Sequence, residues 1–133
     1  FIDYQREHWS NTFGFFGFNL MHHVNGILHG SWNDVIAVFL PNVAAFVCSL
    51  LLLAYGVGKV PGAYIAYGIA YLVVAYSPAW LLSGGRYMMV VFPLWGILAL
   101  AARGRGRRFA VLTILGVMSL YYGMLFALGW SVL

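Results

Sequence analysis

Four long apolar stretches, separated by short polar or glycine-containing connections, make up most of this chain. They cover residues 35–56, 61–82, 87–102 and 109–131. A helix needs about 20 residues, within a range of about 17 to 25, to cross the hydrocarbon of a bilayer, because each residue rises about 1.5 Å. The pattern predicts an all-α, polytopic membrane protein with about four transmembrane helices.

The third stretch is the shortest, and it spans a bilayer only with help from its flank. Arg86 and Tyr87 can extend it, because a guanidinium reaches the head groups and a phenol hydroxyl stays hydrated. Pro41, Pro78 and Pro93 lie inside or beside the stretches, where each removes a backbone donor. We therefore expect kinked helices, which suit a cavity better than a plain membrane anchor.

Residues 1–34 do not share the apolar pattern. They hold all three acidic residues and all four histidines of the chain, together with a dense set of aromatic residues, and are too polar to span. We expect an interfacial or re-entrant segment that lies against the extracytoplasmic membrane face. The chain is thus divided into this segment, 1–34, and a four-helix transmembrane region, 35–133.

The composition agrees with a membrane environment. Hydrophobic residues make up 63% of the chain and charged residues 8%, whereas soluble domains carry about 25% charged residues. An ordinary soluble domain is thereby excluded, and the lipid bilayer is the expected partner. The single cysteine, Cys48, lies in an apolar stretch and cannot form a disulfide within the chain.

The basic residues predict an orientation rather than a nucleic-acid partner. The net charge is +4, and four of the seven basic residues form one short run, Arg103, Arg105, Arg107 and Arg108. Basic loops between spans lie on the cytoplasmic side, and the loop that contains Lys59 is two spans away, hence on the same side. Arg86 and residues 1–34 are then extracytoplasmic.

The sequence "SGGRY" supplies the strongest candidate site. Gly84 and Gly85 lack a Cβ, so that their backbone amides can approach an anion closely beside Arg86 at a helix start. A guanidinium binds phosphate oxygens bidentately, and shielding from water strengthens the attraction. We predict a phosphate-binding corner formed by Ser83, Gly84, Gly85, Arg86 and Tyr87; the alternative is that Arg86 only anchors its helix at lipid head groups.

A second polar site is predicted in "DYQREHW", where Arg6, Glu7, His8 and Trp9 follow one another. A carboxylate or imidazole here can act as a general base or orient a sugar hydroxyl. No spacing singles out one residue, and an exposed ion pair that includes Asp3 is the alternative. No catalytic residue is therefore assigned.

His22 and His29 are seven residues apart and share one face of a helix. Two imidazoles on one face are a weak indication of a metal or pigment site, and both precede the first predicted span. We expect neither a metal site nor a resident cofactor such as haem, and instead expect interfacial hydrogen bonding. A loose stripe of tyrosines indicates either helix packing or a polar groove: Tyr64, Tyr67, Tyr71 and Tyr76.

Three segments together resemble one family. "LSGGRYMMVVFPLWGILALA" is similar to the small-residue corner, Arg-Tyr and Phe-Pro-Leu pattern near the C-terminus of PIG-V-type, GPI mannosyltransferase-like membrane glycosyltransferases. "FIDYQREHWSNTFGFFGF" resembles their aromatic extracytoplasmic segment, and "LFALGWSVL" their closing helix. All three segments occur in the same order, over most of the chain.

The resemblance implies a GT-C glycosyltransferase. Such enzymes transfer a sugar, here mannose, with inversion from a polyprenyl- or dolichyl-phosphate donor on the extracytoplasmic side. Arg86 and Tyr87 would lie near the donor phosphate.

The chain departs from the family in one respect. The family's acceptor-activating aspartate lies in a loop after the first span, and this sequence has no such loop. Asp34 follows Trp32 and Asn33 but directly precedes a span, so the role is not transferred to it. The chain therefore resembles the C-terminal part of such an enzyme, and alone it is not expected to catalyse transfer. The alternative is a non-catalytic helical scaffold subunit of a larger, energy-converting membrane complex.

Overall fold

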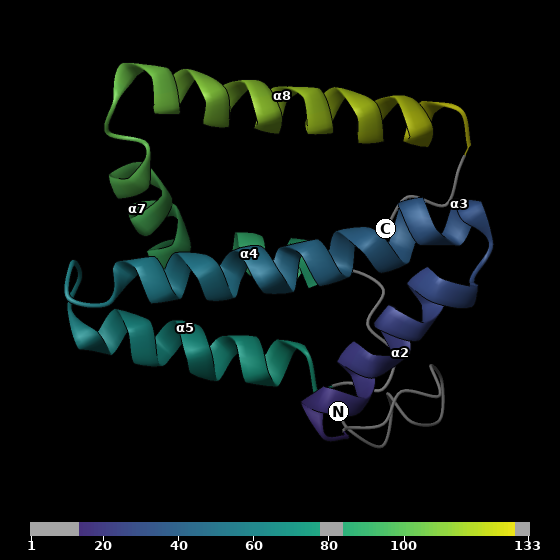
Figure 1. The fold of residues 1–133 in the computed structure, drawn as a ribbon, viewed down its shortest axis with the longest axis horizontal. Coiled ribbons are helices and arrows are strands. Elements are labelled where there is room, and N and C mark those ends of the chain that lie inside the picture. Colours follow the sequence, from purple (N-terminus) through teal and green to yellow (C-terminus); the bar gives the residue numbers. More distant parts are fainter. Residues whose placement is uncertain (1–13, 78–83, 130–133) are drawn as a thin grey trace.

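The computed structural model describes residues 14–77 and 84–129, apart from the side chains of Phe16 and residues 84–86. These residues form helices and turns and contain no strand (Figure 1). The elements are α2 (Phe16–His29), α3 (Trp32–Asp34), the π-helical turn η1 (Val35–Phe39), α4 (Leu40–Gly56), α5 (Gly62–Ala75), α6 (Gly84–Met89), α7 (Phe92–Ala101) and α8 (Arg105–Ala127).

Two helices are long and apolar enough to cross a membrane. The first is continuous through α3, η1 and α4, from Trp32 to Gly56, and the second is α8. They contain 25 and 23 residues, whereas the apolar helices α5 and α7 contain 14 and 10. By length and composition the described residues therefore supply two membrane-length helices, alongside two shorter apolar ones.

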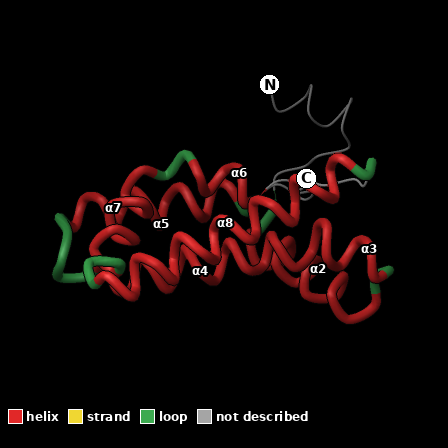
Figure 2. The backbone as a smooth tube through the Cα atoms, turned by 90° about the horizontal axis from the view of Figure 1, so that it is seen from above, coloured by secondary structure: helices red, strands yellow, loops and turns green. Residues whose placement is uncertain are grey.

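Helices α4, α5 and α8 run along the long axis of the molecule, whereas α7 runs across it (Figure 1). Figures 1 and 2 show α4 and α5 side by side, joined by a tight loop, with α6 and α7 packed against the same pair. Helix α2 packs against η1 and the first part of α4. The loop between α4 and α5 and the loop between α7 and α8 lie at the same end of the molecule, and α2 lies at the other end.

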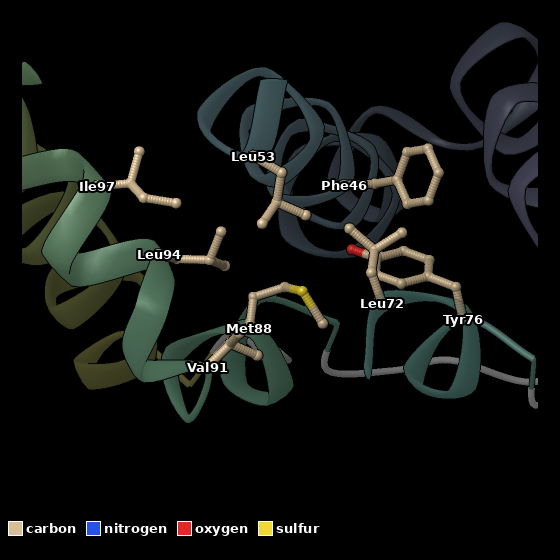
Figure 3. Close-up of a cluster of buried hydrophobic side chains, with 8 residues drawn as sticks. All are labelled: Phe46, Leu53, Leu72, Tyr76, Met88, Val91, Leu94 and Ile97. Atoms are coloured by element: carbon tan, nitrogen blue, oxygen red, sulfur yellow. The ribbon is translucent and has the colours of Figure 1, made fainter. Parts of the chain in front are cut away.

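The buried core lies between α4, α5, α6 and α7. Its side chains point toward one another in Figure 3: Phe46, Leu53, Leu72, Tyr76, Met88, Val91, Leu94 and Ile97. Two glycines allow this close packing. A Cβ on Gly68 would lie 2.5 Å from Leu53, and a Cβ on Gly56 would lie 2.7 Å from Ile97. Small residues at such crossings let helices approach closely, which is the main source of packing energy between helices in lipid.

The apolar stretch 87–102 is not one helix, because Pro93 interrupts it. Helix α6 ends at Met89, Val91 has a non-helical backbone (φ −78°, ψ 85°), and α7 starts at Phe92 with the proline in its first turn. In a continuous helix Pro93 would leave the Met89 carbonyl without its donor. The indole Nε1 of Trp95 donates to that carbonyl oxygen at 2.8 Å. The side chain thus satisfies the backbone group that the break exposes.

Pro41 produces a different irregularity, in which the helix stays continuous. Five residues before it form the π-helical turn η1, where the Leu40 amide donates to the Val35 carbonyl five residues back. In that register Pro41 leaves the Ile36 carbonyl without a backbone donor. The Tyr122 hydroxyl from α8 donates to the Ile36 oxygen at 3.3 Å. An aromatic side chain again satisfies the backbone oxygen freed by a proline.

Helix α8 has few buried side chains. Leu125 is its buried residue, and Phe109, Leu120 and Phe126 are each more than 70% exposed. Its apolar surface therefore needs lipid or further helices as its environment.

Tyr76→Phe tests one buried polar contact in this core. The Tyr76 side chain is fully buried, and its hydroxyl donates to the Asn42 carbonyl at 2.7 Å. Removing that hydroxyl should lower the free energy of unfolding by about 1 kcal/mol. Unfolding in mild detergent measures the change. Tyr67→Phe is the matched control, since Tyr67 is 42% exposed; equal effects of the two substitutions would contradict the assigned bond.

Candidate functional site

The predicted phosphate corner falls at the start of helix α6. Gly84, Gly85 and Arg86 form its first half, while Ser83 lies outside the described residues. Met88 is buried in the core, and Tyr87 is 47% exposed. Helix α6 packs against α4, with Met88 in the buried core and Tyr87 on the exposed side. The backbone of the corner therefore belongs to a packed helix rather than to a free loop.

The second predicted polar site, Arg6, Glu7, His8 and Trp9, lies outside the described residues, as does Asp3. The tyrosine stripe lies within them and does not share one environment. Tyr64 and Tyr67 are partly exposed and pack their rings against Phe92, with centroids 5.5 and 5.8 Å away. Tyr76, in contrast, is buried in the core. These tyrosines therefore act mainly in helix packing.

A shallow groove of about 500 Å³ lies between α2 and the α3–η1 turn. It contains the two histidines predicted to share a helix face, and its lining residues are His22, Asn25, Gly26, His29, Gly30, Asp34 and Phe39. A Cβ on Gly26 would lie 2.6 Å from the Phe39 ring, so the glycine allows that ring to reach α2. The groove is lined by imidazole, amide and carboxylate groups beside an aromatic ring.

Asp34 is held by a local helix cap. The Ser31 hydroxyl donates to its carboxylate Oδ2 at 2.7 Å and accepts from the Asp34 amide at 3.3 Å. This is a reciprocal cap, in which serine and an acid three residues later stabilise a helix start. Asp34 therefore has a structural role at the start of the long helix. Among the described residues, no group of three or more His, Cys, Asp or Glu side chains could hold a metal ion.

His23 packs against His22 and Phe39 of this groove, and the sequence did not single it out. It is 3% exposed, and neither ring nitrogen has a hydrogen-bond partner. Its ring contacts Phe39 with centroids 5.8 Å apart and His22 at 5.9 Å. Burial, and to a lesser extent the neighbouring His22, lowers the pKa of His23 to about 4. The adjacent pair His22–His23 was visible in the sequence, but burial depends on the packing of α2 against Phe39.

The depressed pKa of His23 predicts an acid-sensitive fold. The unfolded chain binds a proton at this histidine near pH 6.5, whereas the folded chain does so only near pH 4. The free energy of unfolding should keep its full value above pH 6.5, where His23 is neutral in both states. It should fall by about 1.4 kcal/mol per pH unit as the pH drops toward 4. His23→Phe should flatten this dependence, and the exposed His29→Gln should not. Melting temperatures across pH 4–8 test it; an unchanged slope in His23→Phe would refute the assignment.

Comparisons of this chain with protein-family models, with curated proteins and with solved structures found no match. The residues themselves therefore carry the argument for function.

Proposed function

We propose that this chain is the C-terminal part of an integral-membrane, GT-C glycosyltransferase. The complete enzyme transfers a sugar from a polyprenyl- or dolichyl-phosphate donor on the extracytoplasmic side. The resemblance of the motifs indicates that this sugar is mannose. An all-helical fold with two membrane-length apolar helices is compatible with such an enzyme. In this proposal α5 and the broken α6–α7 pair cross the bilayer as well, giving four passes.

The observation that carries the proposal is where residues 84–87 lie in the fold. Figure 2 shows α6 farther than α7 from the loops that carry Lys59 and the arginine run. If the basic loops are cytoplasmic, Arg86 belongs to the extracytoplasmic half. A lipid-linked donor presents its phosphate at the head-group level on that side. The helix arrangement therefore supports a phosphate role for this corner.

The proposed role of residues 83–87 is to stabilise negative charge on the lipid phosphate. As the sugar leaves, negative charge grows on the lipid phosphate, and a preplaced guanidinium stabilises the transition state more than the ground state. Arg86 supplies this charge, with Tyr87 and the Gly84–Gly85 amides beside it. Arg6, Glu7, His8 and Trp9 are proposed as the polar residues near the acceptor. We assign no catalytic base.

Donor binding is the direct test, since it does not need the complete enzyme. The chain in mild detergent is exposed to a photoactivatable polyprenyl-phosphate analogue, and crosslinking is competed with polyprenyl-phosphate mannose. We expect saturable labelling that the competitor suppresses at least tenfold, while polyprenol without phosphate leaves it unchanged. Equal competition by polyprenol would mean that only the lipid tail is recognised, and the proposal would fail.

A scaffold subunit of a larger membrane complex is the second candidate, and α8 favours it. That helix exposes apolar side chains along nearly its whole length. Such a surface is suited to packing against other membrane helices. A scaffold would purify in a fixed ratio with its partner subunits, and Arg86→Ala would not change its donor labelling. In the enzyme fragment, the labelling would depend on Arg86.

A further inference from the structure

Four exposed guanidiniums cluster where α7 turns into α8. They belong to Arg103, Arg105, Arg107 and Arg108, all of them exposed. The Arg107 side chain folds back over the turn, so that a Cβ on Gly104 would lie 3.3 Å from its Nε. The first turn of α8 contains no acidic residue. This turn therefore carries four positive charges within six residues.

No carboxylate among the described residues offsets this charge. Asp34 is the acidic residue within the described ranges; it is hydrogen bonded to Ser31, and α3 lies at the end of the bundle away from the α7–α8 turn (Figure 1). Lys59 lies at the same end as the cluster but is already engaged. Its Nζ donates to the Tyr55 carbonyl at 2.8 Å and lies 3.3 Å from the centroid of the Tyr55 ring.

We propose that the four arginines form a docking surface for anionic phospholipid head groups. The apolar part of α8 begins at Phe109, directly after Arg108, and runs to Ala127. At about 1.5 Å per residue this part is about 28 Å long, close to the hydrocarbon thickness of about 30 Å. With that part in the bilayer core, the guanidiniums lie at the phosphate level of one leaflet.

Their chemistry fits that occupant. A guanidinium binds phosphate oxygens bidentately and keeps its charge at any physiological pH. Each basic residue near an anionic membrane surface strengthens attraction about fivefold, an effect that salt screens. The surface is separate from the proposed donor site, because α7 lies between the start of α6 and the α7–α8 turn, and it does not depend on glycosyl transfer.

The test measures lipid affinity in detergent. The chain is titrated with mixed micelles that contain phosphatidylglycerol or phosphatidylcholine, and binding is followed by thermophoresis at 50 and 500 mM salt. We expect preference for phosphatidylglycerol, weakened by salt. Combined substitution of the four arginines by glutamine should reduce that affinity at least tenfold, whereas Lys59→Gln, which removes one charge, should reduce it by no more than about fivefold. Circular dichroism checks that each variant keeps its helix content.

Three results would overturn the proposal. The first is equal affinity for the two lipids. The second is a helical quadruple variant that retains affinity within twofold. The third is complete displacement of phosphatidylglycerol by inorganic phosphate at the same charge concentration, which would indicate a site for soluble anions. If the quadruple variant loses its helices, the single substitutions Arg105→Gln and Arg108→Gln replace it, each expected to weaken binding at least twofold.

Discussion

Arg86→Ala is expected to reduce the affinity for polyprenyl-phosphate mannose at least tenfold and, in the complete enzyme, to lower kcat/KM at least 100-fold. The reason is that one preorganised group that stabilises developing charge contributes about 10²–10³ in rate. Arg86→Lys should restore part of the affinity, because the charge returns without the bidentate geometry. Crosslinking competition gives the affinity, and transfer of labelled sugar in membranes gives kcat/KM.

Arg103→Ala is the matched control for that experiment. This substitution removes an arginine side chain from the α7–α8 turn, at the end of the bundle that carries the Lys59 loop. Donor affinity should stay within twofold. If Arg86→Ala also stays within threefold, the phosphate role of the corner is wrong, and Arg86 is a membrane anchor.

Ile97→Ala is expected to be the most destabilising of the proposed core changes, lowering the free energy of unfolding by about 2–5 kcal/mol. Ile97 is fully buried, and it contacts the backbone of α4 at Gly56 closely enough that a Cβ there would lie 2.7 Å away. Since lipid is as apolar as isoleucine, the loss is chiefly van der Waals packing in the cavity left behind. Unfolding in mild detergent measures it.

Leu120→Ala in α8 provides the comparison for this loss. Leu120 is 77% exposed, so its truncation should change stability by less than about 0.5 kcal/mol. A loss at Leu120 as large as that at Ile97 would mean that α8 is buried against another part of the protein. The core described for α4 to α7 would then be incomplete.

The helical class of this fold could be predicted from the sequence, and so could the interruptions. Long apolar stretches with few charges allow little else in lipid, because every backbone group must be hydrogen bonded within the helix. Pro41 and Pro93 predicted irregular helices, and both produce them. Their outcomes differ, a π-helical turn in one case and a break in the other. In each case an aromatic side chain donates to the freed carbonyl, Trp95 to Met89 and Tyr122 to Ile36, and sequence spacing does not give these pairings.

The candidate sites were less predictable than the fold. The "SGGRY" sequence is visible without a structure because its residue types carry the chemistry. The groove beside His22 and His29 was visible in part, as a shared helix face. The burial of His23 was not, because it depends on Phe39 reaching α2 past Gly26, a contact between separate helices. From the sequence, Asp34 was only an acidic residue that directly precedes a predicted span; its hydrogen bonds to Ser31 are known from the structure.

The proposed function requires that the two ends of the bundle face opposite sides of a membrane. Single cysteines at Arg86 and at Arg105, in a Cys48→Ser background, test this with a membrane-impermeant maleimide on sealed vesicles of known orientation. We expect the cysteine at 86 to be labelled only from the extracytoplasmic side and the cysteine at 105 only from the cytoplasmic side. Labelling of both from the same side would contradict it.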